Sequence, residues 1–360
     1  MESIHFQINS TNISMKPDLN DTIIIKSNRK DYLVSYSNKM LCELLCEVYN
    51  ECDFIFIDKN VYNLNPDLFN CHTYLLFDAT EENKTIESVL HLVNFLHTNK
   101  FDKKNKLIVI GGGITQDIGG FACGIYKRGI HWIFIPTTLL SMTDSCIGGK
   151  VCVNHLSKNM LGMFVAPDKI YISDDFLKTL SHNDIISGIG ESIKLALICG
   201  EYAYNYLYDQ LQKKNYINII KISSLIKKSI IEIDEFDENE RKVLNYGHSI
   251  GHALETTSNY FIPHGIAVLI GIYIKNRLFY NDKYKKINDF ILEIIDHKYF
   301  CITIDYHIFI QHLLSDKKNT GNKLCLIKLK DIGKTVFEYV KLEDIYEPLQ
   351  NILSSLFLHS

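Results

Sequence analysis

KLIVIGGG at residues 106–113 places a continuous apolar run directly before three glycines, and a helical pattern follows from about Asp117. A glycine turn between a strand and a helix lets the backbone approach a pyrophosphate and directs helix N-terminal N–H groups at it. The same turn can also be a tight connection without a ligand, and it is not the G-x-G-x-x-G fingerprint. The stretch predicts a strand-turn-helix unit of an α/β fold with a candidate nucleotide site at Gly111–Gly113.

Further apolar runs of strand length surround this stretch, at residues 54–58, 73–77, 131–135 and 169–173. Helical patterns at 39–49 and 86–96 lie between them. Continuous apolar strands separated by helices indicate a mostly parallel sheet that is covered on both faces. We therefore expect a Rossmann-like α/β domain over residues 1–174.

The pattern becomes helical after about residue 175. Apolar residues recur at three- and four-residue intervals, as amphipathic helices require, in 185–198, 219–233, 241–255, 266–279 and 287–296. Two β-rich runs within 323–340 flank Asp331-Ile332-Gly333 and predict a hairpin before a last helix near 342–357. We expect a mostly α-helical domain over residues 175–360, and a cleft between the two domains as the ligand site.

Composition and charge exclude several classes of partner. The 360 residues include 38 basic and 42 acidic side chains, a net charge of −4, without a basic patch suited to nucleic acid. The longest apolar stretch, Gly265–Ile274, is shorter than the roughly 20 residues of a membrane helix, and Met1–Ser10 has no features of a signal peptide. Ten scattered cysteines fit reduced thiols, so we expect a cytoplasmic protein.

Three histidines and one glutamate are candidate metal ligands. His248 and His252 lie four residues apart on one helical face, and His264 follows in a Pro-His-Gly turn. Imidazoles and a carboxylate can form a three-ligand site with an open position, as a catalytic zinc ion requires. Glu191 stands in an apolar helix and needs a partner there, which a metal or Lys194 could supply. Histidine pairs on helices also occur without a metal, and this interpretation stays open.

Six segments together closely resemble the 3-dehydroquinate synthase branch of the sugar phosphate cyclase family. They occur in the expected order over roughly residues 54 to 335 and are GGGITQDIGGFACGIYKRGIHWIFIPTTLL (111–140), DSCIGGKVCVNHLSKNMLG (144–162), ESIKLALI (191–198), RKVLNYGHSIGHALE (241–255), PHG (263–265) and SDKK (315–318). The resemblance implies an NAD-binding α/β domain, a helical metal- and substrate-binding domain, and a homodimer.

The resemblance also implies roles for single residues. Glu191, His248 and His264 match the ligands of a Zn²⁺ or Co²⁺ ion, whereas His252 matches a nearby active-site group. Positions that hold NAD are matched by Asp58, Asn60, Glu81, Lys84, Gly112, Gly113, Asp117, Thr137, Thr138, Asp144, Lys158, Thr179 and Leu180. Positions that hold the substrate are matched by Lys150, Asn159, Lys194, Lys227, Arg241, Asn245 and Lys318, and Arg128 matches an arginine that reaches the phosphate from the other subunit.

The implied reaction converts the seven-carbon phosphorylated keto acid DAHP to 3-dehydroquinate and phosphate, a step of the shikimate pathway. NAD⁺ transiently oxidises a secondary alcohol, the adjacent C–H becomes acidic, and phosphate leaves by elimination. The hydride then returns, and the ring opens and recloses by intramolecular aldol addition. Such an enzyme is a carbon–oxygen lyase that regenerates NAD⁺ in every turnover.

Several departures from the family pattern keep alternatives open. Val151-Cys152 replaces the usual Thr-Gly after the lysine, the loop 154–159 is one residue shorter, and Ile266 replaces a glutamate after His264-Gly265. The first fifty residues also differ from the common enzyme. The alternatives are a sister cyclase that makes a cyclitol or amino-dehydroquinate, a metal-dependent NAD alcohol or glycerol dehydrogenase, and a non-catalytic descendant.

Overall fold

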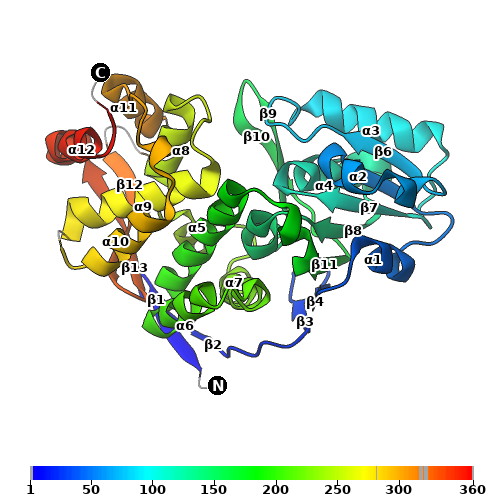
Figure 1. Ribbon diagram of the computed structural model, residues 1–360, viewed down its shortest axis with the longest axis horizontal. Helices are drawn as coiled ribbons and strands as arrows, with labels where there is room; N and C mark the ends of the chain where they lie inside the picture. The colour runs from blue at the N-terminus through cyan, green and yellow to red at the C-terminus, as the bar shows by residue number, and fades with distance from the viewer. Residues whose placement is uncertain (1–2, 281, 316–318, 320–322, 359–360) are drawn as a thin grey trace. The chain divides into compact units, whose positions relative to one another are not determined.

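The computed structural model describes residues 3–280, 282–315, 319 and 323–358, which divide into two compact units (Figure 1). The sheet unit consists of Asp18–Leu180 and Lys214–Phe236, and the helical unit of Met1–Pro17, Ser181–Lys213 and Asp237–Ser360. These units differ from a single division at residue 174. The first 17 residues belong to the helical unit, and helix α7 (Tyr216–Ile231) belongs to the sheet unit. The assignment of NAD and metal binding to separate domains stays a prediction.

A seven-stranded sheet in the order β3-β4-β11-β8-β7-β5-β6 forms the core of the sheet unit. Its six parallel strands are β4 (Tyr32–Ser37), β5 (Phe54–Asp58), β6 (Thr73–Phe77), β7 (Lys106–Gly111), β8 (His131–Pro136) and β11 (Lys169–Ser173). Strand β3 (Thr22–Ile25) runs antiparallel at one edge. All five apolar runs identified in the sequence are parallel strands, which confirms the predicted Rossmann-like fold.

The sheet unit also contains helices. They are α1 (Leu41–Val48), α2 (Lys59–Leu64), α3 (Ile86–Thr98), α4 (Gly113–Ile125) and α7, with short turns η1 (Pro66–Phe69), η2 (Tyr126–Arg128), η3 (Ser141–Ser145) and η4 (Asp174–Thr179). Strands β9 (Lys150–His155) and β10 (Ser157–Phe164) form a separate antiparallel pair.

The strand order reverses between β5 and β7. Strand β6 follows β5 in the chain and lies on one side of it, while β7 and then β8 lie on the other side. Ile57 pairs with Ile110, so Asp58 and Gly111 end side by side at the carboxyl edge of the sheet. Open α/β sheets bind ligands outside such a switch point, so this edge is the expected nucleotide site.

The helical unit contains α5 (His182–Cys199), α6 (Glu201–Gln212), α8 (His248–Thr257), α9 (His264–Tyr280), α10 (Lys285–Ile294), α11 (Tyr306–Leu314) and α12 (Leu342–Leu356), with η5 (Glu240–Asn245) and η6 (His297–Tyr299). It also has a four-stranded sheet in the order β12-β13-β1-β2, made by β12 (Lys323–Asp331), β13 (Lys334–Lys341), β1 (Ile4–Ile8) and β2 (Thr11–Met15). The antiparallel β12–β13 pair confirms the predicted hairpin, and β1 joins it in parallel.

One predicted helix is wrong in its extent. The pattern over 241–255 predicts a single helix, but the chain forms η5, then turns at Gly247, and begins α8 at His248. Gly247 has a φ of 84°, a left-handed conformation that glycine adopts without the cost of a side chain. The break places His248 at the first turn of a new helix.

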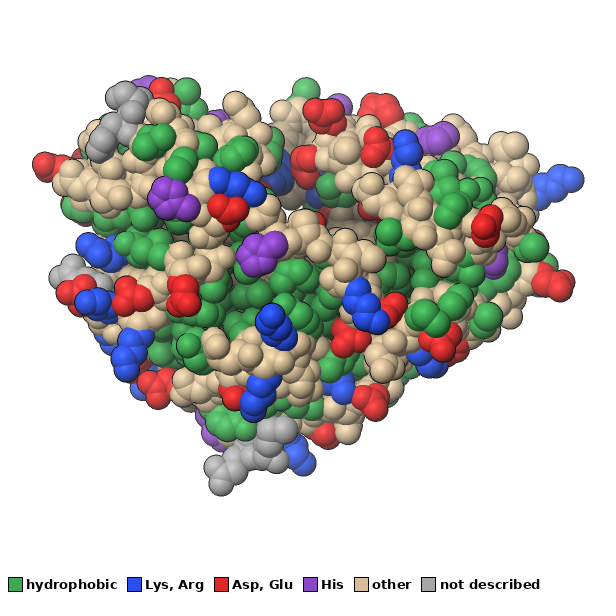
Figure 2. Space-filling view, in the orientation of Figure 1, with side chains coloured by type: hydrophobic (Ala, Val, Ile, Leu, Met, Phe, Trp, Pro, Cys, Tyr) green, Lys and Arg blue, Asp and Glu red, His purple; other side chains and the backbone are tan. Residues whose placement is uncertain are grey.

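The surface carries mixed charge. Figure 2 shows Lys and Arg side chains interspersed with Asp and Glu side chains over the visible face. Among the helices of the described residues, we find none with both the length and the apolar character needed to cross a bilayer.

Candidate functional site

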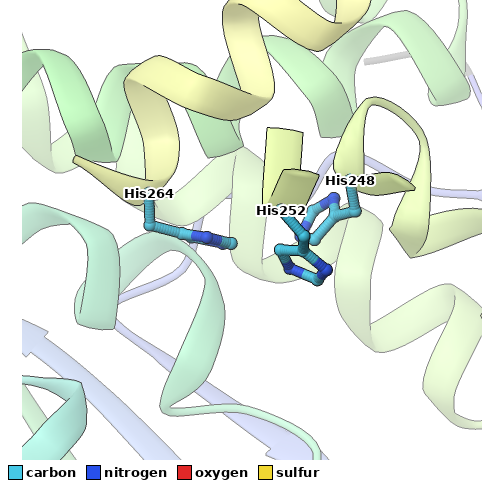
Figure 3. Close-up of side chains that lie close together, drawn as sticks. All are labelled: His248, His252 and His264. Atoms are coloured by element: carbon cyan, nitrogen blue, oxygen red, sulfur yellow. The ribbon is translucent and has the colours of Figure 1, made fainter. Parts of the chain in front are cut away.

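Three helices of the helical unit bring a glutamate and three histidines together. Glu191 comes from α5. His248 and His252 come from α8, and His264 from the start of α9 (Figure 3). One ring nitrogen from each histidine lies within 4.8 Å of one from each of the others. The Oε1 atom of Glu191 lies 3.3 Å from Nε2 of His264 and 3.7 Å from Nε2 of His248. These atoms form a compact cluster of metal-ligating groups.

Glycine at the helix crossing makes this arrangement possible. Gly190, next to Glu191, faces the backbone of Gly265, next to His264, and a Cβ atom on Gly190 would lie 2.3 Å from the Gly265 carbonyl oxygen. No side chain fits at that distance, so α5 and α9 meet backbone to backbone. The neighbouring side chains, Glu191 and His264, consequently come within contact distance.

Buried charges surround the cluster. Glu191 is fully buried and forms an ion pair with Lys194, one turn further along α5 and also buried. Burial lowers the pKa of His264, but the carboxylates of Glu255 and Glu191 outweigh burial and raise that pKa to about 10. The two carboxylates therefore favour a positive charge at this position, which a proton or a bound cation can supply.

The hydrogen bonds of the histidines distinguish two possible ligand sets. Nδ1 of His248 lies 3.2 Å from the carbonyl oxygen of Tyr246, and Nδ1 of His264 lies 3.1 Å from Oε2 of Glu255. When Nδ1 carries the proton, Nε2 keeps its lone pair, and both Nε2 atoms face Glu191. Glu191, His248 and His264 therefore fit as ligands of a divalent metal, because the Nδ1 atom of each histidine already has a hydrogen-bond partner. The three histidines without Glu191 form the second possible set.

The switch point of the sheet unit collects many of the residues matched to NAD. Helix α4 begins at Gly113 directly after β7, and no side chain caps its N-terminus. A Cβ atom on Gly112 would lie 3.0 Å from Cγ2 of Thr138, so the turn packs against the end of β8. Asp58 ends β5, accepts a hydrogen bond from the Asn60 N–H at 2.8 Å, and has its pKa raised by burial. These features fit a pyrophosphate at the helix end and a ribose at the carboxylate.

A buried ion pair lies beside this edge. Nζ of Lys84 lies 2.6 Å from Oδ2 of Asp117 and 2.7 Å from Oδ1 of Asn159. Burial lowers the pKa of Lys84, but the Asp117 carboxylate outweighs burial and raises it. The Cys152 N–H donates to Asp117 at 3.0 Å, and burial raises the pKa of that thiol to about 12. Lys84 thus contacts both Asp117, which like Lys84 matches a position that holds NAD, and Asn159, which matches a position that holds the substrate.

The other residues matched to NAD occupy several places in the sheet unit. Glu81 accepts a hydrogen bond from Nδ2 of Asn154 at 2.8 Å, and Asp144 forms a 2.8 Å ion pair with Lys227. Thr137 donates its N–H to the Gly111 carbonyl at 2.9 Å, between the ends of β8 and β7. Lys158 lies on β10, while Thr179 and Leu180 lie at the end of η4.

The residues matched to substrate divide between the units. Lys194, Arg241, Asn245 and His252 belong to the helical unit, whereas Arg128, Lys150, Asn159 and Lys227 belong to the sheet unit. Arg241 is buried, and the side chain of Lys150 is exposed at the start of β9. Lys318 lies outside the described residues.

Arg128 has an unusual backbone. Lys127, Arg128 and Gly129 have consecutive positive φ angles of 49°, 66° and 108°. Left-handed backbone at residues other than glycine is strained and is enriched at functional sites. Arg128 also lines a cavity of about 240 Å³ with Gly148 and Gly149, the residues before Lys150.

Glu255 is absent from the residues that the sequence analysis singles out. It is buried on α8, with its carboxylate against His264. The sequence signal is the same as for Glu191, a carboxylate at an apolar helix position, because Ala253 and Leu254 precede it. Its partner lies on another helix, and the spacing along the chain does not reveal that contact.

Solved structures define the class of this fold. A 2-epi-5-epi-valiolone synthase from Streptomyces hygroscopicus, with NAD⁺ and Zn²⁺ bound, matches with a TM-score of 0.78 and 21% identity over 92% of this chain and 98% of that one. A 2-deoxy-scyllo-inosose synthase complexed with carbaglucose-6-phosphate, NAD⁺ and Co²⁺ matches with a TM-score of 0.76 and 22% identity, over 92% of this chain and 99% of that one. The chain therefore has the fold of the sugar phosphate cyclases.

Sequence comparison identifies the particular family. Models of the N-terminal and C-terminal parts of 3-dehydroquinate synthase match residues 74–187 and 188–319. A 3-dehydroquinate synthase from Clostridium tetani is 35% identical over 327 residues, which are 85% of this chain and 83% of that protein. The chain belongs to the 3-dehydroquinate synthase family, as its motifs predict, and it is an enzyme.

Proposed function

We propose that this enzyme converts DAHP to 3-dehydroquinate and phosphate with NAD⁺ and a Zn²⁺ or Co²⁺ ion. The single observation that carries the metal-dependent part is the convergence of Nε2 of His264 and Nε2 of His248 on Oε1 of Glu191, at 3.3 and 3.7 Å. Family membership supports the choice of reaction.

Glu191, His248 and His264 would hold the metal ion. One carboxylate and two imidazoles leave a coordination position open, as a catalytic site requires. The hydrogen bonds that the two Nδ1–H groups donate to the Tyr246 carbonyl and the Glu255 carboxylate would keep both Nε2 atoms directed at the ion. When bound, the metal supplies a Lewis acid for the substrate oxygen, and NAD⁺ supplies a hydride acceptor.

The carboxyl edge at β5 and β7 would hold NAD⁺. The uncapped start of α4 offers N–H groups to the pyrophosphate, and Asp58 offers a carboxylate to the ribose hydroxyls. The Lys84–Asp117 pair stands beside this edge and would fix the position of Asn159. A bound cofactor and Asn159, a residue matched to substrate binding, would then share one hydrogen-bonded network.

Cations would hold the carboxylate and the phosphate of the substrate. Lys150, Lys194, Lys227, Arg241 and Lys318 would bind these anionic groups, and Asn159 and Asn245 would donate hydrogen bonds to oxygen atoms. Lys194 also neutralises Glu191. The half-exposed His252 lies 4.0 Å from Oε2 of Glu255 and would move a proton at the substrate.

A sister cyclase is the second candidate, because the hairpin that follows Lys150 departs from the family pattern. Cys152 stands where the family has a glycine, and its backbone and thiol contact Asp117. Ile266, which replaces a glutamate, is almost fully buried, so it acts as a core residue here. A simple NAD alcohol dehydrogenase is less well supported, since it would have no use for Lys150, Lys227 and Arg241 together.

A homodimer is the proposed assembly, with Arg128 completing the phosphate site of the partner subunit. The strained backbone at Arg128 supports a functional role for this side chain. The cytoplasm is the proposed compartment, which the ten free cysteines support.

The direct experiment incubates the purified protein with DAHP, NAD⁺ and Zn²⁺ or Co²⁺ and measures phosphate release and the identity of the product. The proposal expects phosphate and 3-dehydroquinate in equal amounts. A cyclitol formed from another sugar phosphate, with no turnover of DAHP, would favour the sister cyclase.

A further inference from the structure

Glu255 is a buried carboxylate to which the proposed reaction assigns no catalytic step. It lies on α8, two turns after His248, and its side chain is 4% exposed. Its Oε2 atom is 3.1 Å from Nδ1 of His264, which belongs to α9. Helix α8 therefore supplies one candidate ligand, His248, and also the hydrogen-bond partner of a ligand on the neighbouring helix.

The contact determines which nitrogen of His264 can ligate. An ionised carboxylate only accepts hydrogen bonds, so Nδ1 must carry the proton in the pair with Glu255. The lone pair of the neutral ring is then on Nε2, which faces Oε1 of Glu191 at 3.3 Å. His248 has a different arrangement, because its Nδ1 contacts the carbonyl oxygen of Tyr246. A side-chain substitution can remove the partner of His264 and leave the partner of His248 in place.

The negative charge of Glu255 also favours metal binding by His264. The Glu255 carboxylate lies beside the ring of His264, on the Nδ1 side, while Glu191 lies on the Nε2 side. A second carboxylate strengthens the attraction for a dication and raises the basicity of the imidazole that accepts it. We propose that Glu255 is a positioning residue that fixes the tautomer of His264 and raises metal affinity, an inference that rests on the proposed metal centre.

The test compares Glu255→Ala and Glu255→Gln with the wild-type protein and with Thr256→Ala as the matched control. The Thr256 hydroxyl bonds to the carbonyl oxygen of His252 within α8, outside the proposed ligand contacts. Zn²⁺ affinity is measured by chelator competition, the Co²⁺-loaded proteins are compared by visible absorption, and thermal unfolding of the metal-free proteins reports the fold.

A loss of about 10- to 100-fold in Zn²⁺ affinity is expected for Glu255→Ala, as for other outer-shell partners of metal ligands. Glu255→Gln should fall between Ala and wild type, because its amide oxygen can still accept from Nδ1 but carries no charge. Thr256→Ala should bind Zn²⁺ as the wild type does. If Glu255→Ala does not fold, the Zn²⁺ affinity of the nearly isosteric Glu255→Gln protein is compared with that of the wild type instead.

Unchanged Zn²⁺ affinity in the folded Ala or Gln variant, with affinity lost in His264→Ala, would overturn the role of Glu255 and leave the metal centre standing. Wild-type protein that binds neither Zn²⁺ nor Co²⁺, or His264→Ala that binds as well as wild type, would instead overturn the proposed metal centre itself.

Discussion

The backbone of Gly265 lies directly on that of Ser187, so that a Cβ atom at Gly265 would be 1.8 Å from the Ser187 carbonyl oxygen. The Gly265 N–H also donates a hydrogen bond to Oγ of Ser187 at 2.9 Å. This contact fixes the start of α9 against α5, and it thereby sets the position of His264 relative to Glu191.

Gly265→Ala should destabilise the protein and weaken metal binding together. At an open helix position, a change from glycine to alanine stabilises the folded protein by roughly 0.5–1 kcal/mol. An added methyl group in a closed contact instead lowers the free energy of unfolding by about 1–3 kcal/mol or more. Chemical unfolding and Zn²⁺ titration of the variant measure both effects. A variant as stable as wild type with normal Zn²⁺ affinity would show that the close crossing is not needed.

His264→Ala should lose stoichiometric metal, whereas His252→Ala should keep it. The reason is that Nε2 of His264 lies 3.3 Å from the buried Oε1 atom of Glu191, while Nε2 of His252 points to Oε2 of Glu255, at 4.0 Å. Metal content after dialysis, measured by elemental analysis, distinguishes the two ligand sets. Loss of metal in His252→Ala would favour the set of three histidines.

The parallel sheet could be predicted from the sequence because its strands are continuous apolar runs. Residues 54–58 and 106–110 stand out since both faces of these strands are buried. The role of residues 4–15 could not be predicted, because β1 pairs with β13 more than three hundred residues away. Local pattern carries no information about such a distant partner.

The candidate metal centre was predicted only in part for a similar reason. Glu191 was recognisable as a charge in an apolar helix, and His248 and His264 by their match to a family pattern. Spacing alone would have paired His248 with His252. The contribution of Glu255 depends on the crossing of α8 and α9, which only the packing of the two helices reveals.

Lys150→Met should keep the fold and lose activity. The side chain is exposed at the start of β9, so no core contact is removed. If the ammonium contributes about 3–4 kcal/mol to the transition state, kcat/KM should fall by roughly two to three orders of magnitude. Lys169→Met, another exposed lysine of the sheet unit, serves as the control for steady-state kinetics. A Lys150→Met enzyme as active as that control would remove Lys150 from the site.

Mixed dimers test the contribution of Arg128. Arg128→Ala and Lys150→Ala proteins should each be nearly inactive, but subunit exchange should create dimers in which one site has both wild-type residues. Phosphate release should therefore reappear in the mixture. Continued inactivity after exchange has been demonstrated, for example by mass-tagged subunits, would contradict a site shared between subunits.

The regeneration of NAD⁺ tests the central claim most directly. The enzyme, loaded with Zn²⁺ or Co²⁺, is given DAHP in large excess over NAD⁺, and phosphate and NADH absorbance are followed together. A cyclase returns each hydride before the product leaves, so phosphate should exceed total NAD⁺ many times over while NADH does not accumulate. Stoichiometric NADH without phosphate release, from DAHP or any other phosphorylated keto sugar, would contradict the assignment and favour a dehydrogenase.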